Sequence, residues 1–159
     1  MTKQSFKYGI AAVVRKFPWA MQGAQTLWRF TRPRFSIGVV GVVFNAAGEV
    51  LLVEHVFHPY TPWGLPGGWV ERGEQPDETL VRELHEELQL NAVVTRIVAM
   101  ERPPTPHLDL AYLCRANGDV GALSGELLDY RWCDPDQLPA IRLFHRQAIQ
   151  QAVSVYRDS

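Results

Sequence analysis

The sequence has only two cysteines and no long apolar stretch. Cys114 and Cys133 lie far apart, form no Cys-x-x-Cys pair and have no histidine at zinc spacing, which argues against a disulfide framework and a structural zinc. We expect both to be buried thiols. The apolar run 10–14 is too short for a signal-peptide core, and nowhere are there about 18 uninterrupted apolar residues. The expected location is therefore cytoplasmic.

Acidic residues are absent from the first part of the chain: the first is Glu49, although the net charge of the whole is only -1. Residues 1–35 form a basic, aromatic-rich extension whose helical spacing is broken at Pro18. We expect one or two helices that pack on the remaining domain or on a second subunit in a homodimer. A membrane-surface or nucleic-acid element is the alternative, but nothing else in the composition supports it.

Residues 36–159 are long enough for one compact domain, because the chain is 47% hydrophobic and 159 residues long. A β-branched run at 36–44 predicts a buried strand, and 50–53 predicts the strand that returns from a turn at 45–48. Further strands are expected at 92–100, 108–115 and 130–133, and an amphipathic helix at 142–156. This mixture predicts an α/β domain.

The segment from Pro76 to Leu88 has the periodicity of a helix. Proline suits its first turn, where a missing N–H costs nothing, and leucines recur every four residues to form one apolar stripe. Glu83, Glu86 and Glu87 stand at positions i, i+3 and i+4, so their carboxylates share a different face. Like charges so close repel, unless solvent screens them or a hard cation such as Mg²⁺ bridges their oxygens.

The residues around these glutamates resemble the Nudix box, which is written Gly, five residues, Glu, seven residues, Arg-Glu-aliphatic-x-Glu-Glu-x-Gly-aliphatic. The matching residues span 23 positions of the sequence, and they are Gly68, Glu74, Arg82, Glu83, Leu84, Glu86, Glu87 and Leu90. The approach to the box at residues 63–66 is also similar to the family pattern. The chain is thus identified as resembling a Nudix hydrolase, which implies an α/β/α sandwich with a mixed β-sheet.

One position departs from the pattern, because Gln89 stands where the family has glycine. The family glycine lies just past the helix end in a left-handed conformation, which costs about 1 kcal/mol for another residue. Asn91 tolerates that conformation. We therefore expect a shifted helix end, with Asn91 taking over the stop and the metal site intact.

The resemblance implies a water attack on a diphosphate linkage that requires Mg²⁺, with Mn²⁺ as a substitute. It implies metal ligation by the Gly67 carbonyl and by Glu83, Glu86 and Glu87, while Glu74 and Arg82 pair behind them. A further carboxylate often comes from a loop outside the box, and Glu126 is the candidate. The expected catalytic residues are Glu83, Glu86, Glu87 and Glu126. Glu83 and Glu126 are rival candidates for the general base. Asp109 and Asp129 are further alternatives for the loop carboxylate.

The substrate is expected to be a small nucleotide, because the family box binds the diphosphate and other loops read the attached groups. Trp63, Trp69 and Arg102 are candidate substrate contacts, by stacking and hydrogen bonding. His55 and His58 are expected to contact substrate or solvent, since magnesium prefers oxygen ligands. The resemblance slightly favours ADP-ribose or another nucleoside diphosphate sugar. A nucleoside triphosphate pyrophosphohydrolase and a non-catalytic nucleotide-sensing module are the alternatives.

Overall fold

The computed structural model describes residues 35–157, together with Trp19 and Trp28. The chain divides into two units, Met1–Arg34 and Phe35–Ser159, and the second contains every strand and helix discussed below. The helices expected within residues 1–35, and their packing on the domain or on a second subunit, lie outside the described residues apart from these single positions. In the part of the chain that is described, no helix is both long and apolar enough to cross a membrane.

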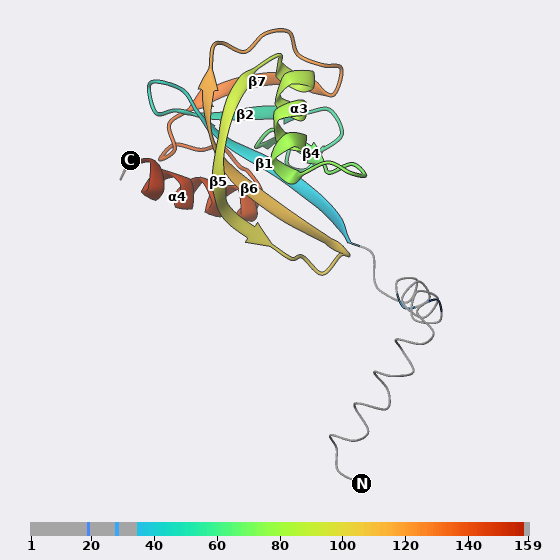
Figure 1. Ribbon diagram of the computed structural model, residues 1–159. Helices are drawn as coiled ribbons and strands as arrows, with labels where there is room; N and C mark the ends of the chain where they lie inside the picture. The colour runs from blue at the N-terminus through green and yellow to red at the C-terminus, as the bar shows by residue number, and fades with distance from the viewer. Residues whose placement is uncertain (1–18, 20–27, 29–34, 158–159) are drawn as a thin grey trace. The chain divides into compact units, whose positions relative to one another are not determined.

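Seven strands and two helices make up this unit (Figure 1). Most of the strands and both helices fall where the sequence pattern predicts them, with ends that differ by a few residues. Their bounds are β1 Ser36–Phe44, β2 Val50–His55, β3 Trp63–Gly64, β4 Gly67–Trp69, α3 Pro76–Leu88, β5 Asn91–Glu101, β6 His107–Asn117, β7 Leu127–Cys133 and α4 Leu143–Arg157. The two shortest strands, β3 and β4, were not expected, since both lie in segments rich in glycine and proline.

The strands form one mixed sheet in the order β3-β2-β1-β6-β5. β1 runs parallel to β6, with Ser36 opposite His107, and antiparallel to β4. β7 pairs with β2. The expected hairpin exists, but β1 and β2 meet only where Phe44 pairs with Val50, and each strand forms most of its pairs with other neighbours. The long pairing of β1 with β6 brings residues about 70 positions apart into contact.

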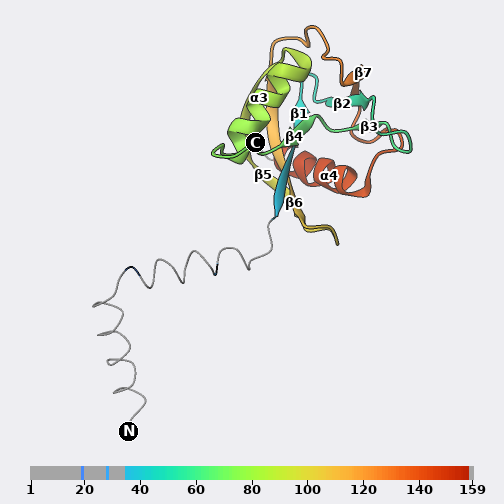
Figure 2. The same cartoon turned by 90° about the vertical axis from the view of Figure 1, so that its right-hand side faces the viewer.

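The two helices cover opposite faces of this sheet (Figure 2). Alternate residues of β1 and β2 point to either side, so that Val43 joins the core under α3 and Val42 joins the core under α4. The α3 side includes Leu80, Leu84 and Leu88, and the α4 side includes Phe144, Ala148, Ile149 and Ala152, all buried. The predicted α/β/α sandwich with a mixed sheet is confirmed.

Helix α3 begins at Pro76, as the sequence pattern predicts, and ends at Leu88. Pro76 occupies the first turn, and the Gln75 N–H donates to the Glu78 carboxylate at 3.1 Å. Gln89 itself takes the left-handed conformation, with φ 47° and ψ 31°, and its N–H donates to the His85 carbonyl. The expectation of a shifted end was wrong, because Asn91 is already the first residue of β5.

The loop between β6 and β7 explains how a non-glycine residue is held at this position. The Gly121 N–H donates to the Leu88 carbonyl at 2.8 Å, and the Ala122 N–H donates to Gln89 Oε1 at 3.4 Å. A Cβ on Gly121 would lie 2.8 Å from the Gln89 Cβ, so the loop packs directly on the glutamine.

Both cysteines are free, with Cys114 buried as expected and Cys133 only partly buried.

Candidate active site

The acidic face of α3 borders an open cavity of about 480 Å³. Glu83, Glu86 and Glu87 reach it from the helix, and Glu126 reaches it from the loop before β7. Gly67 belongs to β4 and completes the wall beside β1. The fold thus brings together all the residues that the family resemblance names as metal ligands. It also places Glu126, which lies 39 positions after Glu87 in the sequence, on the same cavity.

Burial makes the carboxylates of this cavity unusual. Glu87 is only 7% exposed, and its Oε2 has no hydrogen-bond partner among the described residues. Burial, followed by the charges of Glu83 and Glu126, raises the pKa of Glu87 to about 7. Burial also raises the pKa of Glu83, against the opposing charge of Arg82. Removing these groups from water therefore disfavours their negative charge, and a cation would relieve that cost.

Arg82 joins the helix to the loop before it. Its Nε donates to Glu74 Oε1 at 2.9 Å, and its Nη2 donates to Glu74 Oε2 at 3.2 Å, which makes a two-pronged ion pair. The hydrogen bond from Arg82, followed by that from the Thr79 hydroxyl, lowers the pKa of Glu74 to about 2. Its Nη1 donates to Glu83 at 3.0 Å and to Glu86 at 3.1 Å. Arg82 therefore fixes Glu74 and partly neutralises the acidic face.

The glycines that lead into the helix are required by close contacts. Gly67 has φ +150°, and a side chain there would overlap the Val39 carbonyl of β1. A side chain on Gly68 would overlap the Glu83 carboxylate. The bare backbone of β4 therefore lets the acidic helix approach the sheet closely.

The structure divides the three predicted substrate contacts. Trp69 lines the carboxylate cavity and is 55% exposed. Trp63 does not line this cavity, and its ring faces the Arg131 guanidinium at 3.6 Å. Arg102 does not line it either, and it lies over the Phe35 ring at 5.5 Å. Of the three, Trp69 lines the cavity that the glutamates border.

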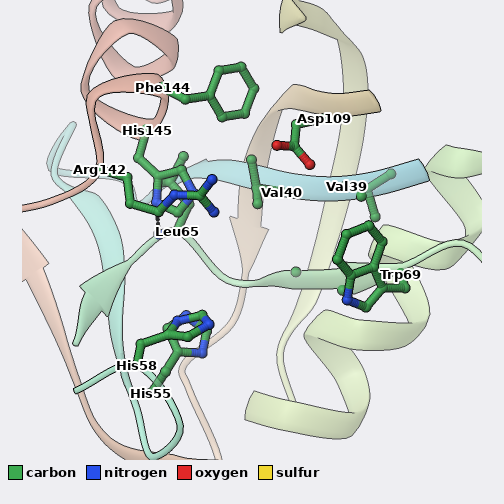
Figure 3. Close-up of a pocket in the computed structure, with 13 residues that line it drawn as sticks. Val39, Val40, His55, His58, Leu65, Trp69, Asp109, Arg142, Phe144 and His145 are labelled. Carbon is green, nitrogen blue, oxygen red and sulfur yellow. Dashed lines mark hydrogen bonds between the residues drawn. The ribbon is translucent and has the colours of Figure 1, made fainter. Parts of the chain in front are cut away.

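A smaller cavity of about 150 Å³ adjoins the first and shares His55, His58, Trp69, Gly67 and Gly68 with it (Figure 3). Its further walls come from β1, from the start of β6 and from the start of α4. The side chains that these elements contribute include Val39, Val40, Asp109, Arg142, Phe144 and His145. Asp109, an alternative loop carboxylate from the sequence, thus lies in this cavity and not among the glutamates. Asp129 lines neither cavity.

Two histidines of the smaller cavity, His55 and His145, have lowered pKa values. His145 is only 6% exposed, and its Nδ1 accepts the Leu65 N–H at 3.1 Å. Burial, followed by the charge of Arg142, lowers the pKa of His145 to about 3. Burial and the charge of His58 also lower the pKa of His55. With Nδ1 used as an acceptor, the proton of His145 sits on Nε2.

Sequence reasoning gave no role to Arg142 or His145. Arg142 directly precedes α4, and His145 lies in the first turn at a position that helical periodicity alone assigns to the core. A polar residue on the apolar side of a predicted helix was the available signal. It identifies a buried polar contact but not its partner, because Leu65 lies 80 positions away.

The chemistry of the carboxylate cavity fits a divalent cation. The donors are hard oxygens, and the orphaned Glu87 Oε2 is an acceptor that the protein leaves unsatisfied. The described His, Cys, Asp and Glu side chains are not gathered into any group of three or more that could hold an ion, and Arg82 engages Glu83 and Glu86 instead. The donor set therefore suits Mg²⁺ or Mn²⁺, although it is not assembled around one.

Fold and site together define an α/β/α domain that presents a glutamate-rich helix to an open cavity. A family model for the NUDIX domain matches residues 34–152. The chain therefore belongs to the NUDIX domain family, which confirms the resemblance found in the sequence. It also confirms the predicted enzyme class, Nudix hydrolase, at the level of the family.

Two curated relatives are named as a hydrolase and as a putative diphosphatase. The NAD-capped RNA hydrolase NudC of Pectobacterium atrosepticum is 35% identical over 102 residues, which cover 63% of this chain and 39% of the relative. The putative 8-oxo-dGTP diphosphatase of Bacillus subtilis is 30% identical over 115 residues, which cover 71% of this chain and 76% of the relative. The chain thus spans about two fifths of the length of the NudC relative.

Solved structures share the fold at low sequence identity. An ADP-ribose pyrophosphatase from Streptococcus suis has a TM-score of 0.65 at 23% identity, covering 79% of this chain and 93% of its own. A UDP-X diphosphatase has a TM-score of 0.66 at 20% identity, covering 99% of this chain and 86% of its own. At such identities the likeness supports the architecture alone.

Proposed function

We propose that this chain is a metal-dependent hydrolase that cleaves the diphosphate linkage of a nucleoside diphosphate joined to another group. One observation carries the proposal. Glu83, Glu86, Glu87 and Glu126 all border the same open cavity, and Glu87 keeps a buried oxygen without a partner. Buried acceptors are normally satisfied, so an unsatisfied carboxylate beside three others indicates a site for a cation and its phosphate ligands.

The proposed metal ligands are Glu83, Glu86, Glu87 and Glu126, with the Gly67 carbonyl as a fifth. When bound there, Mg²⁺ or Mn²⁺ supplies charge neutralisation for the diphosphate and a lowered pKa for water. The protein groups do the rest. Glu74 anchors Arg82, and Arg82 holds Glu83 and Glu86 in place through its Nη1.

Two residues compete for the role of general base. Glu83 accepts a hydrogen bond from Arg82, which favours its ionised form and opposes the effect of burial on its pKa. Glu126 lies in the loop before β7 and does not take part in the Arg82–Glu83 ion pair. Separate Glu83→Gln and Glu126→Gln variants distinguish them, because loss of the base removes the acidic limb of the pH–rate profile and loss of a ligand alone weakens metal affinity.

Small nucleotides are the proposed substrates, with a preference for ADP-ribose or another nucleoside diphosphate sugar. The names of a curated relative and of two structural neighbours support linkages between a nucleoside diphosphate and a second group, as in NAD-capped RNA, ADP-ribose and UDP-X. A nucleoside triphosphate is the second candidate, because the Bacillus subtilis relative is matched over most of its length and is named for 8-oxo-dGTP. The cytoplasmic location and the homodimer remain predictions.

The test is a substrate panel assayed with Mg²⁺, with Mn²⁺ and with excess chelator. The panel includes ADP-ribose, other nucleoside diphosphate sugars, dinucleoside polyphosphates and nucleoside triphosphates, and Glu86→Gln serves as the control variant. Selective turnover that both the chelator and the variant abolish is the expected result. Full turnover in chelator would refute the metal proposal, and tight binding without turnover would favour a nucleotide-sensing module.

A further inference from the structure

Gln89 has a side chain that the end of α3 does not need. The helix ends through the backbone of this residue, whose N–H donates to the His85 carbonyl, and a glycine takes the left-handed conformation more easily. The side chain is exposed, so burial in the core does not account for it. Among the described residues, its hydrogen bond is the one that Oε1 accepts from the Ala122 N–H at 3.4 Å. The side chain of Gln89 therefore acts on the loop between β6 and β7.

This loop, residues 118–126, follows the C-terminal end of α3. The Gly121 N–H donates to the Leu88 carbonyl at 2.8 Å, and the Ser124 N–H donates to the Glu87 carbonyl at 2.9 Å. The Gln89 side chain lies against the same loop, since a Cβ on Gly121 would stand 2.9 Å from Gln89 Oε1. The end of the acidic helix thus holds the loop through two backbone carbonyls and one side chain, that of Gln89.

The loop ends at Glu126, whose backbone is fixed on both sides. Its N–H donates to Ser124 Oγ at 3.3 Å, and its carbonyl accepts the Val56 N–H at 3.0 Å. Ser124 links two of the glutamates, because its N–H donates to the Glu87 carbonyl and its hydroxyl accepts the Glu126 N–H. A shift of the loop along α3 would therefore move the Glu126 side chain relative to Glu87.

The backbone of the loop is what places the Glu126 carboxylate. Glu126 is exposed, and no hydrogen bond or ion pair from a described residue holds its side-chain oxygens. It nevertheless borders the same cavity as Glu83 and Glu87. Contacts behind a charged ligand orient it and change the affinity of a site for a cation. This step rests on the proposed function, because it takes Glu126 as a metal ligand from it.

We propose that Gln89 is a positioning residue, whose side chain anchors the loop 118–126 to the end of α3 and thereby holds the Glu126 carboxylate beside Glu87. The chain departs from the box pattern at this position, and the departure supplies a hydrogen-bond acceptor that a glycine lacks. The backbone hydrogen bonds of the loop do not depend on the identity of residue 89. Loss of the side-chain acceptor therefore loosens the loop without releasing it.

The experiment compares the wild-type chain with Gln89→Met, Glu126→Gln and the double variant. Methionine has about the length of glutamine but only a weak acceptor, so the change removes the hydrogen bond and keeps the size of the side chain. Gln137→Met is the matched control, because Gln137 is exposed, lines neither cavity and makes a side-chain hydrogen bond of 3.4 Å to Asp134. Amide hydrogen exchange is measured in chelator, and the dissociation constant for Mn²⁺ is measured by calorimetry without substrate.

In chelator, the amides of Ser124 and Glu126 should exchange about fivefold faster in Gln89→Met, which is the effect of one ordinary hydrogen bond. The dissociation constant for Mn²⁺ should rise about fivefold in the same variant, and about tenfold or more in Glu126→Gln. In the Glu126→Gln background, Gln89→Met should have no further effect on it, because the carboxylate through which Gln89 acts is already absent. Gln137→Met should change neither quantity, and thermal melting confirms that each variant is folded.

Additive effects of Gln89→Met and Glu126→Gln on the affinity for Mn²⁺ would overturn the proposal, because Gln89 would then act independently of Glu126. An unchanged dissociation constant in Gln89→Met, beside a raised one in Glu126→Gln, would overturn it and leave the proposed ligands in place. Wild-type affinity in Glu126→Gln would remove Glu126 from those ligands and refute the proposal with it. The expected coupling without hydrolysis of any substrate would refute the proposed function and leave the role of Gln89 standing.

Discussion

Helices α3 and α4 lie on opposite faces of one sheet, and each brings buried titratable groups to one of two adjoining cavities. On α3, burial raises the pKa of Glu87 to about 7, and on α4, burial lowers the pKa of His145 to about 3. The physical cause is the same, because removal from water disfavours whichever form is charged. The difference lies in what each group has as a partner.

His145 is satisfied by the Leu65 N–H, whereas Glu87 keeps an oxygen with no partner and faces other carboxylates. His145 is thus a neutral group whose ring nitrogen has its hydrogen-bond partner. On the α3 side, Arg82 neutralises the negative charge of the carboxylates only in part. Nearly equal burial therefore leaves His145 on α4 as a structural group and Glu87 on α3 as a group suited to an ion.

Glu87→Gln provides the strongest test of this difference. The amide keeps the shape but removes the charge that a divalent ion requires, so Mg²⁺-dependent turnover should fall by about a thousandfold. Without metal, the variant should melt at the same temperature as the wild-type chain or higher, because an uncompensated buried charge has been removed. Steady-state kinetics and thermal melting in chelator check both effects. Turnover within a few fold of wild type would remove Glu87 from the site.

The stability of the fold at acidic pH tests the role of His145 on the α4 side. Since the folded pKa of His145 lies below its ordinary value of 6.5, the unfolded state binds more protons between pH 6.5 and about 3. Stability from this group is fully present above pH 6.5 and is lost as the pH falls toward 3, by about 2–4 kcal/mol.

His145→Asn is the matched variant, because its Oδ1 can still accept the Leu65 N–H but does not titrate. Chemical denaturation from pH 7 to pH 4 should show a shallower loss of stability in the variant than in the wild-type chain. Parallel pH profiles in the two proteins would show that His145 is not held neutral.

Arg82→Lys sharpens the comparison by removing hydrogen bonds through which Arg82 holds the carboxylates of α3 and Glu74. A lysine retains the charge but cannot grip both oxygens of Glu74 while also reaching Glu83 and Glu86. Turnover should fall by about 10–100-fold, with the requirement for Mg²⁺ raised. A titration of rate against Mg²⁺ concentration measures this. Arg72→Lys, at an exposed position nearby in the loop, should leave the titration unchanged.

The smallest effect is expected at the end of α3. Gln89→Gly relieves a left-handed conformation that costs a non-glycine residue about 1 kcal/mol. The variant also loses the hydrogen bond from the Ala122 N–H and raises the conformational entropy of the unfolded state. The net change in the free energy of unfolding should lie within about 0.5 kcal/mol of zero. Gly121→Ala should be more destabilising, because its Cβ would press on the Gln89 Cβ. Equilibrium denaturation of both variants tests this order.

Much of the α3 side was accessible from the sequence. Helical periodicity places Glu83, Glu86 and Glu87 on one face. The family resemblance implies that Glu74 pairs with Arg82, as the structure shows. The layers of the fold followed from the resemblance to the Nudix family, which the family match confirms. The stop at Gln89 did not, because a loop more than 30 positions away holds the glutamine in place.

The sequence by itself therefore determined three things: the acidic helix, the pair of Glu74 with Arg82, and the family to which the chain belongs. Only the tertiary structure decided that Glu126 joins the glutamates, that His145 meets Leu65, and that Asp109 stands apart from them beside Trp69. The physical reason is distance along the chain. Helix geometry fixes neighbours three and four residues apart, whereas the parallel pairing of β1 with β6 and the packing of α4 join segments that no local pattern relates.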